Sequence, residues 1–413
     1  MTEAPSHLVR HLVDDVLPWW VTHGPDERHG GVLTCWNNAG TELVSTDKYT
    51  WSQGRWAWLT SRVALAGRDG LLNVDSERFA DLAVTTAKFV RDHMMLPDGT
   101  TAFVTDQQGR PHEPAPGSGL HTSIFADLFA ALGFAGAHRI QPGAGWAQLA
   151  DDLLAASAER GASGQYRSDP YPVPNGYRAL SLPMILVGVG EQVYRASNSA
   201  RAARIVAGAA QDIARHHVVG DDVVEMPRWS PSEVNHGLSL LERHRTPGHV
   251  LECVWFLHHA RDLIEGDVFS PERLGAIACH ALQLGWDDEH GGLFRYVDAD
   301  GGAPRGHPSP SPYESTVTDT WDNKLWWPHA EAMYATRLLA SRAGGEQIEP
   351  WRRRVESYTF HTFPEGPGRE WSQIRNRNGH PLEKVVALPV KDPFHVARAL
   401  LLSVELDAVA ERN

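Results

Sequence analysis

Pairs of helical segments recur along the chain and restrict its possible folds more than any other feature. The first member of a pair is apolar around most of its circumference, as in residues 180–193, and the second carries a polar face, as in residues 200–217. A helix that is apolar on all sides is buried, and an amphipathic helix covers it. About six such helical hairpins predict an all-α toroid in which outer helices surround inner ones. The expected pairs are residues 49–65 with 76–93, 121–132 with 146–159, 180–193 with 200–217, 247–263 with 271–284 and 324–343 with 349–360, followed by a helix at 395–410.

Glycine-marked turns separate these pairs. The segment DERHGGVL at residues 26–33 returns as DDEHGGLF at residues 287–294, and weaker relatives recur every roughly 55 to 80 residues. We expect each of them to lead into a short β-hairpin loop. No Pro/Ser-rich linker divides the chain, and the Gly/Pro/Ser-rich stretch 301–312 fits a long loop at a barrel mouth. We therefore expect a single domain over residues 1–413.

Charge and hydropathy indicate the kind of partner. The chain has 38 Lys and Arg against 51 Asp and Glu, a formal charge of −13, and no basic cluster. This balance argues against nucleic acid or an anionic membrane as a partner and favours a small molecule. The amino-terminal stretch MTEAPSHLVRHLVDD lacks the basic and apolar regions of a signal peptide, and no run of about eighteen apolar residues occurs. We expect a soluble, cytoplasmic protein.

The stretch TPGHVLECVWFL at residues 246–257 begins a helix with two ionisable groups. Thr246 can cap the helix, and Pro247 suits its first position. His249 and Glu252 are three residues apart and share one face, while the remaining positions are mostly apolar. Such a pair is either a hydrogen-bonded core pair or one wall of an active site, and this stretch alone leaves both readings open.

Three further stretches place polar groups at the ends of expected inner helices. Arg55 lies in an aromatic segment that includes Trp51 and Trp58, where it can stack on an indole ring or hold a sugar oxygen that becomes negative. Glu331 follows Trp326 on another helix, and His395 starts the last one. The chain has 15 Trp, whose rings either fill the core or flank a sugar, as expected here of Trp51 and Trp326.

The two histidines indicate proton transfer. Imidazoles have an ordinary pKa near 6.5, so a pair from opposite sides of a ring of helices can act as acid and base near neutral pH. No HExxH motif or comparable ligand set occurs, and Cys35, Cys253 and Cys279 are widely spaced, so we expect neither a metal site nor a disulfide framework. A G-x-S-x-G nucleophile motif is also absent.

A family resemblance covers nearly the whole chain. The segments YTWSQGR, RALSLPMILVGVGEQV, TPGHVLECVWFL, GWDDEHGGLFRYVDADG, KLWWPHAEAMYA and DPFHVAR resemble the N-acylglucosamine 2-epimerase family in order. The resemblance implies an (α/α)6 barrel and interconversion of sugars at C2 without a cofactor. It also implies that His249 and His395 are the acid/base pair, that Glu252 and Glu331 line the site, and that Arg55 binds the sugar near O1 and O2.

Two departures from the family pattern bear on the reaction. Ala397 stands where relatives usually have Pro, which affects the start of the last helix more than His395. Residues 175–185 contain no His, whereas mannose isomerases and cellobiose epimerases tend to have one there, so the chain is closer to the N-acylglucosamine epimerases.

Other readings stay open at this point. A mannose–fructose isomerase shares the first chemical step with an epimerase. A glycoside hydrolase could use Glu252 and Glu331 as its carboxylate pair, and a sugar-binding protein without catalysis is a fourth reading. The sequence also leaves open a homodimer and a nucleotide effector.

Overall fold

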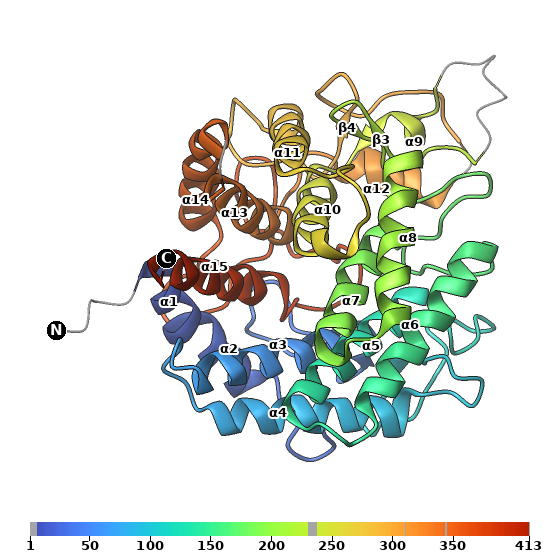
Figure 1. The fold of residues 1–413 in the computed structure, drawn as a ribbon, viewed down its shortest axis with the longest axis vertical. Coiled ribbons are helices and arrows are strands. Elements are labelled where there is room, and N and C mark those ends of the chain that lie inside the picture. Colours follow the sequence, from blue (N-terminus) through green and yellow to red (C-terminus); the bar gives the residue numbers. More distant parts are fainter. Residues whose placement is uncertain (1–5, 230–237, 310, 343–344, 413) are drawn as a thin grey trace.

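Six helices form a closed inner ring in the computed structural model, which describes residues 6–229, 238–309, 311–342 and 345–412. Each inner helix contacts the next one along the chain, and the last returns to the first, so the ring closes (Figure 1). These inner helices are α3 (Thr50–Arg68), α5 (Ile124–Ile140), α7 (Ser181–Ser197), α10 (Pro247–His259), α13 (Trp326–Ala340) and α15 (His395–Arg412).

Amphipathic helices surround this ring, as the sequence predicts. Each packs against the inner helix that precedes it in the chain, and several also reach the neighbouring inner helix. The outer helices are α4 (Ser76–Phe89) with its π-helical extension η2 (Val90–Met94), α6 (Trp146–Ser163), α8 (Ala200–His216), α11 (Pro271–Gly285) and α14 (Glu349–Thr362). The prediction of an (α/α)6 barrel is therefore confirmed.

The last inner helix takes its outer partner from the start of the chain. The helical segment α1 (His7–Arg10) and η1 (His11–Val16), which continues into α2 (Leu17–His23), packs against α15. The two ends of the described chain thus lie together (Figure 1), and this closure favours the expected organisation as one domain. Position 343, the predicted end of the fifth inner helix, lies outside the described residues.

Close packing of α3 against α5 depends on glycine. A Cβ atom added to Gly54 would lie 1.9 Å from the Phe129 carbonyl oxygen, and one added to Gly133 would lie 2.9 Å from the Gly54 Cα. The two helices approach so closely only because neither residue has a side chain. This approach sets Arg55, the neighbour of Gly54, against the ring of Phe129, with 4.0 Å between the guanidinium carbon and the ring centroid.

The described residues contain four two-stranded pairs, which connect the loops between the helices. Of these pairs, only β3 (Val218–Val219) with β4 (Asp222–Val223) is a local hairpin. The other pairs join distant segments: β1 (Lys48–Tyr49) with β2 (Val104–Thr105), β5 (His244–Arg245) with β6 (Val297–Asp298), and β7 (Lys324–Leu325) with β8 (Ile374–Arg375). Since β1, β5 and β7 run directly, or within one residue, into α3, α10 and α13, these pairs hold the amino-terminal ends of three inner helices.

The repeated glycine-marked turn has a structural function. Asp26 in the first copy and Asp287 in the second each receive a hydrogen bond from a buried lysine, Lys48 at 2.9 Å and Lys324 at 3.0 Å. Each lysine lies just before an inner helix, α3 or α13. The repeat thus places two helix starts through matching buried ion pairs, and its sequence similarity does not by itself mark a catalytic site.

The remaining elements lie in the loops. Residues 301–309 form a loop, as expected, and lead to a short helix, α12 (Pro312–Thr320), which the sequence pattern did not predict. Short segments α9 (Leu240–Arg243), η3 (Arg261–Leu263) and η4 (Gly345–Gln347) complete the set. None of the described helices combines the length and the apolar character needed to cross a membrane.

Candidate active site

A cavity of about 170 Å³ opens at the amino-terminal ends of the inner helices. All six inner helices contribute side chains to it. Six of the seven site residues predicted from the sequence line this cavity, namely Trp51, Arg55, His249, Glu252, Trp326 and His395. The fold therefore brings together groups that lie up to 344 positions apart (395 − 51) in the chain.

His249 lies in the first turn of α10 and contacts a buried carboxylate. Its Nδ1 atom is 3.0 and 3.1 Å from the two carboxylate oxygens of Glu225, a residue just after β4. Burial alone would lower the pKa of His249, but the charge and hydrogen bond of Glu225, together with the charge of Glu252, raise that pKa above its ordinary value. With Nδ1–H donating to Glu225, Nε2 is the ring nitrogen left free for a substrate.

His395 has a matching arrangement at the start of α15. Its Nδ1 atom lies 2.8 Å from Glu331 Oε1, and its backbone N–H donates to Asp392 Oδ2 at 2.8 Å. Both catalytic candidates also pack against Trp327, with ring centroids 5.0 Å away for His249 and 6.1 Å away for His395. The two imidazoles thus face one cavity beside the same indole, each held by a carboxylate at Nδ1.

Glu331 lies behind His395 and does not line the cavity. Its side chain is 1% exposed, and its carboxylate accepts hydrogen bonds from Trp255 at 2.7 Å and Arg398 at 2.7 Å. Burial would raise the pKa of Glu331, but Arg398 and His395 hold it down to about 2. This position favours holding His395 over the predicted contact with a sugar, which stays a prediction. It also weakens the glycosidase reading, in which both carboxyl groups flank the scissile bond.

Arg398 links Glu252 on α10 with Glu331 on α13. The sequence analysis did not predict it as a site residue. One guanidinium nitrogen donates to Glu252 at 2.6 Å and to Glu331 at 2.7 Å, and it lies 3.2 Å from His395 Nδ1. One sequence feature could have predicted this role. Arg398 is three residues after His395, so both side chains lie on one face of the helix.

The same geometry bears on metal binding. Glu252, Glu331 and His395 offer ligand atoms within 4.8 Å of one another. Because the Arg398 guanidinium lies among these atoms, a cation already occupies the position that a metal ion would take. This set therefore does not fit a metal ion, and metal-free chemistry stays a prediction.

Arg55 has the stacking role that the sequence suggested, and its contact with a sugar oxygen stays a prediction. Its guanidinium carbon lies 4.0 Å from the ring centroid of Phe129 and 5.6 Å from that of Trp51, while Trp58 is not among its stacking partners. It is also 3.7 Å from the carboxylate of Asp392, which accepts a hydrogen bond from Trp326 at 3.0 Å. Stacking holds the arginine in place, and its position in the cavity wall leaves its charge available to a ligand.

Residues from the loops and from α12 also line the cavity. Arg295 is buried and donates to the Tyr171 hydroxyl at 2.9 Å and to Thr320 at 2.9 Å. Tyr296 and Tyr313, the latter from α12, line the same side. No regular spacing relates these residues, so a sequence pattern could not reveal them.

The closed ring of helical hairpins is an (α/α)6 barrel, and the cavity at the amino-terminal ends of its inner helices is the candidate active site. Among solved structures, cellobiose 2-epimerase from Bacillus thermoamylovorans superposes with a TM-score of 0.75 at 14% identity, covering 96% of this chain and 98% of that one. D-mannose isomerase gives a TM-score of 0.75 at 14% identity, covering 98% and 100%. At such low identity these similarities show the fold alone.

The chain belongs to the N-acylglucosamine 2-epimerase family, whose model matches residues 31–399. The N-acylglucosamine 2-epimerase of Bos taurus is 29% identical over an alignment of 413 positions, which covers 96% of this chain and 90% of the relative. The predicted family resemblance is confirmed.

The pH dependence of activity should change in Glu225→Gln. The glutamate raises the pKa of His249, so the neutral imidazole that accepts a proton predominates only at higher pH. Removing the charge lowers that pKa, and the acidic limb of the kcat/KM profile should move to lower pH, with turnover reduced at least about tenfold because the ring is held less well. Steady-state kinetics across pH would check this, with the exposed Glu265→Gln as control. An unmoved limb would contradict the role of Glu225.

Proposed function

We propose that the protein is a cofactor-independent sugar 2-epimerase that interconverts N-acyl-D-glucosamine and N-acyl-D-mannosamine. The observation that carries the proposal is the pair His249 and His395, which face one cavity with a buried carboxylate on each Nδ1. The name of the Bos taurus relative supports the substrate. The absence of His from residues 175–185, where Ser181 and Met184 line the cavity, agrees with an N-acylglucosamine epimerase.

The geometry suits proton transfer at C2 of an open-chain sugar. One neutral imidazole takes the C2 proton through Nε2, and negative charge develops on O1 of the sugar, where the fixed charge of Arg55 stabilises it. The other imidazole, initially protonated, returns a proton to the opposite face of C2. Glu225 and Glu331 stabilise the imidazolium that forms at either position, so the pair exchanges protonation states in each turnover.

The product distribution in heavy water tests the proposal. N-acetylglucosamine should give N-acetylmannosamine with deuterium at C2, as measured by nuclear magnetic resonance, with no ketose formed. An amide nitrogen at C2 prevents that carbon from becoming a ketone, so this substrate permits epimerisation alone.

The alternative is an aldose–ketose isomerase acting on mannose, as in the D-mannose isomerase of the same fold. In that case mannose would yield mainly fructose, while N-acetylglucosamine would be inert. That result would show that the protein is an aldose–ketose isomerase and not an epimerase.

Replacing Arg55 by lysine tests whether catalysis needs the planar guanidinium group or only its positive charge. Arg55→Lys keeps a cation but loses the planar group that stacks on Phe129, so the charge moves away from the developing oxyanion. We expect kcat to fall about tenfold or more and KM to change much less. Kinetics with the exposed Arg204→Lys variant as control would check this. Wild-type kcat would leave Arg55 with a packing role only.

The cytoplasmic location and the homodimer also stay proposals. Cell fractionation and the mass in solution, measured by light scattering, would test them.

A further inference from the structure

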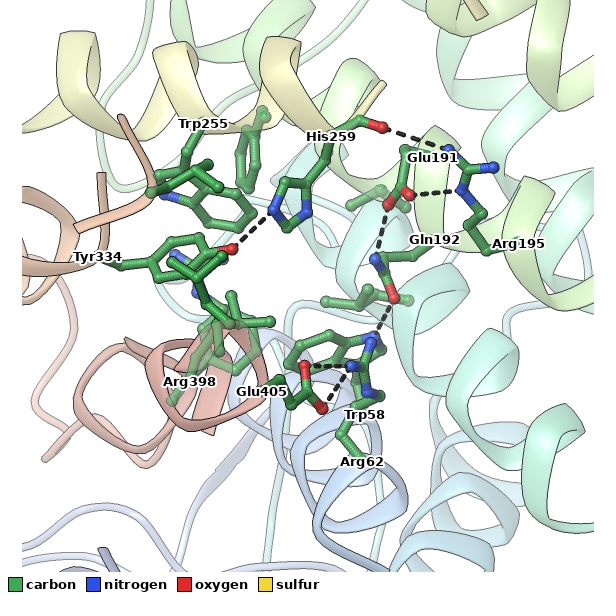
Figure 2. A pocket seen from close by; sticks show the side chains of 18 of the residues that line it. Trp58, Arg62, Glu191, Gln192, Arg195, Trp255, His259, Tyr334, Arg398 and Glu405 are labelled. Carbon is green, nitrogen blue, oxygen red and sulfur yellow. Dashed lines mark hydrogen bonds and ion pairs between the residues drawn. The ribbon is translucent and has the colours of Figure 1, made fainter. Parts of the chain in front are cut away.

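A second, larger cavity lies at the opposite end of the barrel. Its volume is about 380 Å³, and the carboxyl-terminal halves of the six inner helices line it (Figure 2). Phe129 and Ile185 line both cavities, and Arg398 lies between them, since it reaches this one while holding Glu252 and Glu331. The proposed epimerase chemistry uses no other residue of this second cavity.

Aromatic side chains make up much of its wall. Trp58, Trp255 and Phe256 line it together with Phe129 and Phe394. The indole of Trp58 is fixed by Gln192, which accepts its N–H at 2.9 Å and in turn donates to Glu191 at 2.6 Å. Rings held in this way form a rigid apolar surface suited to a flat, apolar part of a ligand.

Arginines at the wall outnumber the carboxylates. Arg62 is neutralised by Glu405 at 2.6 Å, and Arg195 by Glu191 at 2.9 Å (Figure 2). Arg139, from the last turn of α5, has no carboxylate within 4.0 Å among the described residues, although Glu191 and Glu405 act on it at longer range.

Arg342, just beyond α13, likewise forms no ion pair with any residue that the structure describes. Burial, followed by the neighbouring His258 and by the charges of three arginines, lowers the pKa of His259 in the same wall to about 3. The side chains therefore create a positive potential here, in a chain whose net charge is −13.

A purely structural reading of these arginines exists. The carboxyl ends of helices carry partial negative charge, which basic residues in the last turn stabilise. This explains Arg195, which is in the last turn of α7, and in part Arg139 and Arg342, which lie at the ends of α5 and α13. It does not explain Arg62, which is six residues before the end of α3, or the large cavity that separates the groups.

We propose that this cavity binds a small molecule with a flat apolar body and one oxyanion group, a carboxylate or a phosphate, held by Arg139 and Arg342. The apolar body packs between the indole and phenyl rings, and the oxyanion meets the two guanidinium groups that form no ion pair with a carboxylate of the described residues. Arg398 takes no part in holding it, because Glu252 and Glu331 already neutralise it. The site is separate from the sugar cavity and does not rest on the proposed epimerase activity.

Calorimetric titration of the full-length protein tests this site. The probes are phenyl phosphate and benzoate, which carry both parts of the ligand, and benzyl alcohol, which carries only the ring. We expect one phenyl phosphate or benzoate per chain, with the tighter of the two identifying the anionic group, and no measurable binding of benzyl alcohol. Saturating N-acetylglucosamine should leave the affinity unchanged.

Three variants locate the binding. Arg139→Gln and Arg342→Gln should each weaken the affinity about tenfold or more, since each removes one charge-assisted contact. Arg204→Gln removes an exposed charge from α8 and should bind like wild type. Arg342 is exposed, so its variant should fold even if Arg139→Gln does not. Absence of binding, equal affinity in all three variants, or displacement by the sugar would each overturn the proposal.

Discussion

His249→Asn and His395→Asn should each lower turnover by about 10²- to 10⁴-fold while the protein stays folded. Asparagine is close in size and can still donate a hydrogen bond to Glu225 or Glu331, so the buried carboxylates keep a partner. It cannot take up or deliver a proton near neutral pH, so the loss should appear in kcat more than in KM.

The rate of proton exchange at C2 in heavy water shows which histidine acts on which face of the sugar. If one histidine serves each face of C2, a single variant should retain slow exchange from the epimer whose proton faces the remaining histidine, and lose it from the other. The exposed His380→Asn is a matched control and should behave like wild type. Near-normal turnover in both active-site variants would show that neither histidine transfers the proton.

Arg398→Met should destabilise the fold and also abolish most of the activity. The guanidinium is the shared partner of Glu252 and Glu331, and all three side chains are at most 5% exposed. Removing one member of such a buried network leaves unpaired charge and costs about 3–5 kcal/mol of unfolding free energy. Activity should fall as well, because Glu331 holds His395 in place. Urea unfolding at pH 7 would measure the first effect.

The stability loss in Arg398→Met should depend on pH in a predictable direction. Arg398 and His395 outweigh burial and depress the pKa of Glu331 to about 2 in the folded protein. A carboxylate with a depressed pKa stabilises the fold above its unfolded pKa, near 4.3, and the contribution is lost as pH falls toward 2. The gap between wild type and Arg398→Met should therefore be widest above about pH 5 and should narrow in acid.

A double variant tests how much of the stability loss in Arg398→Met comes from unpaired charge and how much from lost packing. Adding Glu331→Gln to Arg398→Met removes one of the two unpaired charges and should recover part of the stability, though not the activity. Stability of Arg398→Met within about 1 kcal/mol of wild type would show that Glu252 and Glu331 do not depend on this arginine.

The sequence by itself determined the helical plan and most of the cavity wall. Helical periodicity is a local property, because side chains three and four residues apart share a face whatever the rest of the chain does. That is why the apolar inner helices could be recognised, and why His249 with Glu252, Arg55 with Trp51, and His395 could be placed at helix starts. The family motifs then identified the sugar chemistry.

Only the tertiary structure decided how the charges pair. Glu225 lies 24 positions from His249, and Arg398 lies 146 positions from Glu252. Some predicted turns are local, as in the hairpin of β3 with β4, but the strand β8 pairs with the distant β7. A buried ionisable group needs a partner, but sequence spacing does not say which one, because that choice depends on which loops and helices the closed ring brings within hydrogen-bonding distance. Closure of the ring therefore placed Arg398 between Glu252 and Glu331, and it placed Glu331 behind His395.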